Sequence, residues 1–104
     1  MNIGATFNAA AAPWAKCMEY SDVFEKGREG REPLHRMAVL FETSGGLRHR
    51  IVVSCHASKN PDLPPSDERR LELLNEILSA ARDWADARER PETFAKETWS
   101  QDED

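Results

Sequence analysis

The side chains best suited to chemistry stand close together in one stretch, FETSGGLRHRIVVSCH, residues 41 to 56. It carries two arginines, two histidines and a cysteine. Imidazole and thiolate groups are the usual ligands of zinc, and a cysteine beside a histidine base can act as a nucleophile. Whether this stretch is a site depends on which of these side chains share one face of a strand.

A zinc site would need four ligands, and the expected strand pairing supplies two. With Gly45 and Gly46 as a two-residue turn, the numbers of facing residues sum to 91, so that His35 faces His56. In this register Cys55 and His49 lie on the opposite face, because successive strand residues alternate between faces. We therefore predict no metal and no cofactor.

The other catalytic patterns are equally incomplete. Cys55 and its neighbour His56 point to opposite faces of a strand, outside the hydrogen-bond reach that a nucleophile and its base require. Cys17 is expected to be a small residue of the core. Cys17 and Cys55 are both expected to stay reduced. The carboxylates of Glu68, Glu72 and Glu76 belong to the solvent face of a helix. The sequence thus predicts no catalytic residue and a protein that is not an enzyme.

The charge of the chain is divided between a basic middle and an acidic end. Of its net charge of −5, none comes from residues 1–82, which hold 11 acidic and 11 basic side chains. Residues 83–104 hold eight acidic and three basic side chains, whereas residues 26–59 have a local charge of +4. This separation predicts two surfaces of opposite sign.

Arginines of the basic middle are candidates for nucleic-acid binding. Arg36, Arg48 and Arg50 flank the expected hairpin, and a pair of strands can follow a phosphate backbone. Against this hypothesis, the chain is acidic overall, and Phe41 is the single aromatic residue of the hairpin available for base stacking. The alternative is that these arginines keep a hairpin edge soluble and pair with nearby glutamates.

Hydrophobic spacing predicts the elements that carry these residues. Pro13 can begin a helix, and Trp14, Cys17, Met18, Ser21 and Phe24 follow at helical spacing, which indicates a helix over about 13–26. Residues 34–43 and 47–56 are expected to form a hairpin around Ser44-Gly45-Gly46.

A long helix is expected to follow the proline-rich loop 57–65. Ser66 is its predicted cap, and the helix should end near residues 88–90, because Pro91 disfavours a helical residue before it. Its apolar stripe consists of Leu71, Leu74, Ile77, Leu78, Ala81, Trp84 and Ala85.

The expected fold class is α+β, a small αββα domain over residues 1–90 with an acidic segment, 91–104, that is a short helix or partly disordered. A two-stranded hairpin is marginally stable alone, so we expect its edge to find another strand. That strand would come from a homodimer with a four-stranded sheet or from a partner protein; the alternative is a third strand formed by residues read here as loop.

Neither a signal peptide nor a membrane span is expected. The alanine run near the start is too weakly hydrophobic for a signal sequence, and no stretch approaches the ~18 apolar residues of a membrane helix. We therefore expect a cytoplasmic protein.

These features favour a small acidic protein that binds another protein as an inhibitor or adaptor. An acidic segment with an aromatic anchor suits a basic partner surface, including one built for nucleic acid, where carboxylates would stand in the place of phosphates. Direct nucleic-acid binding through the arginines is the alternative function. The expected contact residues are Asp83, Asp86, Glu89, Phe94 and Trp99.

Overall fold

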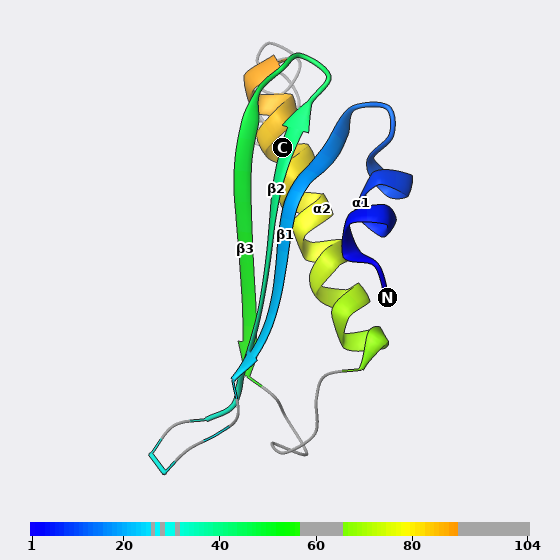
Figure 1. Cartoon of the computed structure of the whole chain (residues 1–104). Coiled ribbons are helices and arrows are strands. Elements are labelled where there is room, and N and C mark those ends of the chain that lie inside the picture. The colour runs from blue at the N-terminus through cyan, green and yellow to red at the C-terminus, as the bar shows by residue number, and fades with distance from the viewer. Residues whose placement is uncertain (26, 28, 31, 57–65, 90–104) are drawn as a thin grey trace, which may run out of the picture.

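The computed structural model describes residues 1–25, 27, 29–30, 32–56 and 66–89. They form α1 (Ile3–Ala11), β1 (Ala15–Glu25), β2 (Leu34–Thr43), β3 (Arg48–His56) and α2 (Asp67–Glu89). The strands make one antiparallel sheet in the order β1-β2-β3, and both helices lie along the same side of it (Figure 1). The α+β class is confirmed, but the fold is αβββα and its sheet has three strands where a two-stranded hairpin was expected.

The helix expected over residues 13–26 is wrong, because this segment forms the edge strand β1. Its residues pair with β2 from Ala15 opposite Thr43 to Glu25 opposite Leu34. A bulge between Cys17 and Glu19 shifts the register and leaves Met18 as the extra residue. The bulge interrupts the two-residue alternation of a strand, so the apolar residues on either side of it mimic the spacing of a helix.

The first helix lies earlier in the chain than expected. Asn2 caps α1 by accepting a hydrogen bond from the Ala5 amide at 2.9 Å. The alanine run continues this helix as far as Ala11, in line with the high helix propensity of alanine. Phe7 is fully buried beneath it and packs 6.0 Å from the Phe41 ring, which attaches α1 to the sheet.

The hairpin of β2 and β3 is confirmed, but its expected register is wrong by one residue. The Thr43 amide donates to the Leu47 carbonyl at 2.8 Å, so the loop has the three residues 44–46. Gly46 has a φ of +86°, as the last position of such a loop commonly requires. The numbers of facing residues therefore sum to 90, and His35 faces Cys55 while His56 pairs with Leu34.

The long helix follows its predicted pattern closely. Ser66 accepts a hydrogen bond from the Arg69 amide at 3.2 Å, which confirms the cap. Most of the predicted stripe packs on the sheet, but Leu71 is 45% exposed and Leu73, which was not included, is buried. At the other end of α2, the Trp84 ring stacks on His49 with 4.4 Å between their centroids.

The core is one-sided. It lies between the helices and the helix-facing side of the sheet, whereas no helix or strand among the described residues covers the opposite side, here called the open face. Val23 and Val52 on the open face are 46% and 53% exposed. The largest fully buried side chains are Phe7, Phe41, Met37, Leu74, Ile77, His35 and Val39.

The third strand that the hairpin needs comes from β1 of the same chain. β1 and β3 are the two edges of the described sheet, and a homodimer joined through either edge stays a proposal.

Neither α1 nor α2, the helices in the part of the chain described, is long and apolar enough to cross a membrane. Residues 57–65 and 91–104, for which a loop and an acidic segment were expected, lie outside the described residues.

Candidate functional site

A hydrogen-bonded network of charged and polar side chains lies between the sheet and the start of α2. The ring of His35 on β2 is hydrogen-bonded through Nε2 to Asp22 Oδ1 on β1. The other oxygen of Asp22 accepts from Arg70 Nε at 2.5 Å, and Arg70 also donates to Asp67 at 3.1 Å. His35 is 1% exposed and the Asp22 side chain 18%, so the contact between them is part-buried. The network joins two strands and a helix.

The Asp22 carboxylate is held in its charged form. Partial burial by itself raises the pKa of Asp22, but hydrogen bonds from His35 and Arg70, together with their charges, outweigh it and bring the pKa below its ordinary value. The same hydrogen bond raises the pKa of Arg70. An ionised carboxylate accepts and does not donate, so the proton between Asp22 and His35 belongs to Nε2 of the ring.

Nδ1 of His35 has no hydrogen-bond partner, and among the described residues it is the only buried side-chain nitrogen or oxygen in that condition. His35 pairs with Cys55 in the register of β2 and β3. Cys55 in turn accepts a hydrogen bond from Arg69 Nη1 at 3.5 Å.

Sequence reasoning missed this cluster for two reasons. Asp22 was assigned to a helix, and the one-residue error of register set His56 in the place of Cys55. A one-residue slip moves every side chain of a strand to the other face, so no grouping across the hairpin survives it. The signal that could have found the cluster is the alternation Tyr20, Asp22, Phe24 after the bulge.

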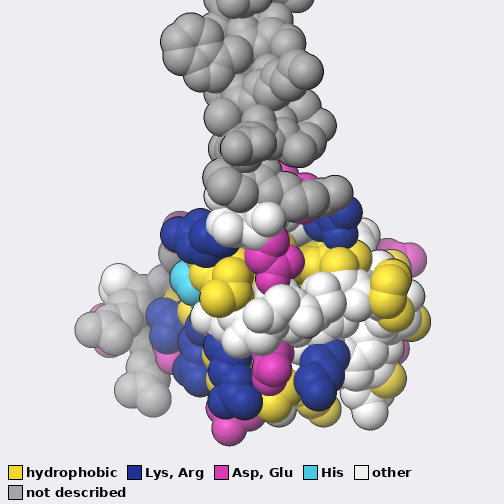
Figure 2. All heavy atoms as spheres, turned by 90° about the horizontal axis from the view of Figure 1, so that it is seen from above, with side chains coloured by type: hydrophobic (Ala, Val, Ile, Leu, Met, Phe, Trp, Pro, Cys, Tyr) yellow, Lys and Arg dark blue, Asp and Glu magenta, His cyan; other side chains and the backbone are white. Residues whose placement is uncertain are grey.

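The three candidate nucleic-acid-binding arginines share the open face but not one cluster. Arg36, Arg48 and Arg50 are all exposed. Arg48 and Arg50 lie near the hairpin loop, whereas Arg36 lies opposite Ser54, toward the other end of β3. In the view from the hairpin end, Lys and Arg side chains gather on the side of the molecule where β3 lies (Figure 2). Two of the arginines have partners, since Arg48 pairs with Glu42 at 3.2 Å and Arg50 with Glu19 at 3.6 Å.

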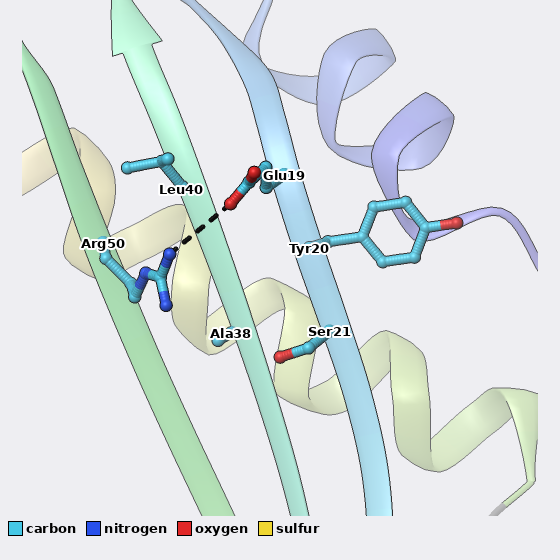
Figure 3. Close-up of a pocket in the computed structure, with 6 residues that line it drawn as sticks. All are labelled: Glu19, Tyr20, Ser21, Ala38, Leu40 and Arg50. Atoms are coloured by element: carbon cyan, nitrogen blue, oxygen red, sulfur yellow. Dashed lines mark ion pairs between the residues drawn. The ribbon is translucent and has the colours of Figure 1, made fainter.

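A hollow of about 70 Å³ lies beside the Arg50–Glu19 pair (Figure 3). Its floor is formed in part by Ala38 and Ser21, whose small side chains leave space between larger neighbours, and Tyr20 points away from it toward α1. The lining residues are Glu19, Tyr20, Ser21, Ala38, Leu40 and Arg50, which include no nucleophile with an adjacent base.

The outer side of α2 carries exposed carboxylates. Glu68, Glu72, Glu76 and Asp83 are all exposed, and at 100° per residue they fall within a narrow arc of the helix, opposite its buried stripe. Glu72 lies 3.8 Å from Arg69, and the other three have no ion pair among the described residues. We call these four residues the acidic stripe.

The predicted contact residues do not form one surface in the structure. Asp83 is part of the acidic stripe, and Asp86 is half-buried beside it and pairs with Arg82 at 3.4 Å. Glu89 instead accepts a hydrogen bond from the buried Thr43 hydroxyl, which attaches the end of α2 to the hairpin. Phe94 and Trp99 lie outside the described residues.

Among the described residues, no three His, Cys, Asp or Glu side chains come together in a way that could hold a metal ion. Comparisons of the chain with models of known protein families, with curated proteins and with solved structures find no match.

Proposed function

We propose that this protein is a non-enzymatic inhibitor or adaptor that binds a partner protein through the outer side of α2. The observation that supports the proposal is the acidic stripe, in which four exposed carboxylates line up on a rigid helix. Residues 68 to 83 of a helix extend over about 22 Å, which is the scale of one side of a standard protein interface.

The partner expected for such a surface is a protein with a basic face. Clustered charges of one sign accelerate association with a surface of the opposite sign and exclude partners of the same sign. In the sequence, the stripe is followed by Glu92, Glu97 and the terminal Asp102-Glu103-Asp104, which adds to the negative charge of this end of the chain. A basic surface that otherwise binds nucleic acid fits this description.

The experiment is a pull-down from a lysate of the source cells with the tagged full-length chain, with and without nuclease, read by mass spectrometry. We expect a stoichiometric protein partner that survives nuclease and is lost in the triple variant Glu72→Gln, Glu76→Gln, Asp83→Asn. A matched control, Glu19→Gln, Glu25→Gln, Glu29→Gln, removes the same charge from exposed positions on or beside the sheet and should keep the partner. Retention of the partner by the stripe variant would contradict the proposal.

Direct binding of nucleic acid is the second candidate function, and one observation favours it. Arg36, Arg48 and Arg50 are exposed on the same uncovered side of the sheet. This function predicts an affinity that falls steeply with salt and is lost when the three arginines are replaced by alanine. A partner set that disappears with nuclease, together with loss of binding in the arginine variant, would favour it over protein binding.

A further inference from the structure

The edge strand β3 presents backbone groups that its own hairpin does not use. The hydrogen bond from the Thr43 amide to the Leu47 carbonyl makes these two residues a hydrogen-bonded pair. Such pairs recur at every second residue of an antiparallel ladder, so the odd-numbered residues of β3 direct their backbone groups to β2. The backbone groups of the even-numbered residues, among them Arg50, Val52 and Ser54, therefore face the outer edge, where no described strand follows.

The side chains of β3 that face the helices are incompletely covered. On the central strand, the helix-facing Met37 and Val39 are fully buried. Their partners on β3, Val53 and Ile51, pack against the same core but are only half-buried. Both helices already lie on this side of the sheet (Figure 1). The missing cover therefore has to come from beyond the β3 edge, and a further strand with apolar helix-facing residues would supply it.

The other edge of the sheet is less suited to a further strand. The bulge between Cys17 and Glu19 interrupts β1, and bulges protect an edge from pairing. The Cys17 amide already donates to the Asn8 side chain of α1 at 2.7 Å. In contrast, β3 pairs with β2 from Arg48 to His56 without a shift of register. The regular edge of this sheet is therefore β3.

We propose that β3 pairs antiparallel with β3 of a second copy of this chain, about a two-fold axis that passes through Val52. Val52 is the middle residue of the strand, so pairing about it engages all nine residues of β3. The backbone groups of Val52 face the outer edge, and in this register they form a hydrogen-bonded pair with those of Val52 in the second copy. The two three-stranded sheets become one sheet with an isologous interface.

The side chains that this register brings together explain why the partner is a second copy. On the helix-facing side, Ile51 faces Val53 of the second copy, so the half-buried apolar residues of the two edges cover one another. On the open face, Arg50 faces Ser54 of the second copy. The arginines of β3 both lie in its first half, and antiparallel pairing sets them opposite residues 53–56, which include no Lys, Arg, Asp or Glu. Like charges therefore do not meet across the pair.

The helices leave room for this pairing. α2 packs on both β2 and β3, so it lies over this pair of strands. In the joined sheet, the midlines of the two β2–β3 pairs are two strand spacings apart, which is about 10 Å. Packed helices lie about 8–10 Å apart. The two α2 helices therefore fit beside each other, antiparallel, across the two-fold axis.

Charges introduced at Val52 test both the pairing and its register, with sedimentation equilibrium of the purified full-length chain as the measurement. Val52 is 53% exposed in the single chain, so Val52→Lys and Val52→Glu should leave the monomer folded, which circular dichroism checks. Each variant sets two like charges opposite each other at the axis, and we expect the dissociation constant of the dimer to rise about tenfold or more. A one-to-one mixture of the two variants sets opposite charges there and should restore the dimer.

The matched control is Val23→Lys, which adds the same charge at a similarly exposed position of β1 on the open face and should leave the dimer intact. A wild-type chain that keeps a mass of 11.8 kDa throughout the micromolar range would overturn the proposal. A dimer that withstands both Val52 variants, or a mixture of the two that remains monomeric, would overturn it as well.

Amide hydrogen exchange distinguishes pairing of the two edges from any other contact between copies. The outward-facing amides of Arg50 and Ser54 should exchange about tenfold more slowly in the wild-type dimer than in monomeric Val52→Lys. The amides of Ile51 and Val53, which bond to β2, should be protected in both proteins. Equal exchange of the outward-facing amides in dimer and monomer would overturn the proposal. Both measurements use the purified chain alone, so their outcome is independent of the proposed binding of a partner protein.

Discussion

The Asp22 carboxylate on β1 is hydrogen-bonded both to the His35 ring on β2 and to Arg70 on α2, 48 residues further along the chain. One side chain of an edge strand thus connects that strand to its neighbour and to the helix that covers them. Asp22 and Arg70 are further apart in sequence than Asp22 and His35, and their contact forms only when α2 has packed on the sheet.

Replacement of Asp22 should destabilise the fold. Asp22→Ala removes the partner of a buried imidazole and of a guanidinium, and hydrogen bonds to charged groups contribute about 1.5–3 kcal/mol each. We expect the free energy of unfolding to fall by about 2–3 kcal/mol in urea titrations. The control Asp83→Ala, at an exposed position of α2 with no ion pair among described residues, should change it by less than about 0.5 kcal/mol.

Stability should depend on Asp22 at acid pH. The pKa of Asp22 is lower in the folded chain than its ordinary value of 3.8. The folded state therefore binds the Asp22 proton less readily than the unfolded state, and the stabilisation by this group is present above pH 3.8 and lost as the pH falls through the folded-state pKa. Unfolding followed between about pH 5 and 2 should show a weaker pH dependence in Asp22→Asn than in wild type. Identical slopes for the two chains would contradict this assignment.

The one-sided core predicts opposite results for two residues of the sheet. Phe41 is fully buried and packs edge-on against Trp84 with 5.7 Å between ring centroids, so Phe41→Ala should cost about 3–5 kcal/mol. Val52 on the open face is 53% exposed, and Val52→Ala should cost less than about 0.5 kcal/mol. A large loss in Val52→Ala at micromolar concentration would mean that another surface covers the open face in solution.

Gly46 should be sensitive to any side chain. Its φ of +86° is unfavourable for residues with a Cβ, although an added Cβ would meet no atom within 4 Å. Gly46→Ala should therefore lower the free energy of unfolding by roughly 1–2 kcal/mol through backbone strain alone. Ser44→Ala, in the same loop, should change it little, and thermal melts of the two variants give the comparison.

The contact between Thr43 and Glu89 should determine how well the last turn of α2 is ordered. Thr43→Val keeps the shape of the side chain and removes the hydroxyl that Glu89 accepts from. We expect a loss of about 1 kcal/mol and faster amide hydrogen exchange in residues near 85–89, with the first turns of α2 unchanged. Equal exchange rates in Thr43→Val and wild type would contradict this prediction. They would show that the packing of Ala85 and Trp84 is sufficient to order the last turn of α2.

Elements specified by local signals could be predicted from the sequence. The bounds of β2 were predicted as observed and those of β3 within one residue, because β-branched residues flank a glycine turn. The long helix was predicted because Ser66, the acidic first turn and the apolar stripe agree with one another. The acidic character of its outer side follows from the same spacing.

The identity of β1, the register of the hairpin and the cluster at Asp22 were decided by the tertiary structure. Residues 15–25 have an apolar spacing that suits a helix, and pairing with β2 together with a bulge makes them a strand. The hairpin register differs by one residue because a three-residue loop replaces the two-residue turn that two glycines suggest. The pairing of β1 with β2, as far as Ala15 with Thr43, decides the first choice, because local propensities differ by too little to do so.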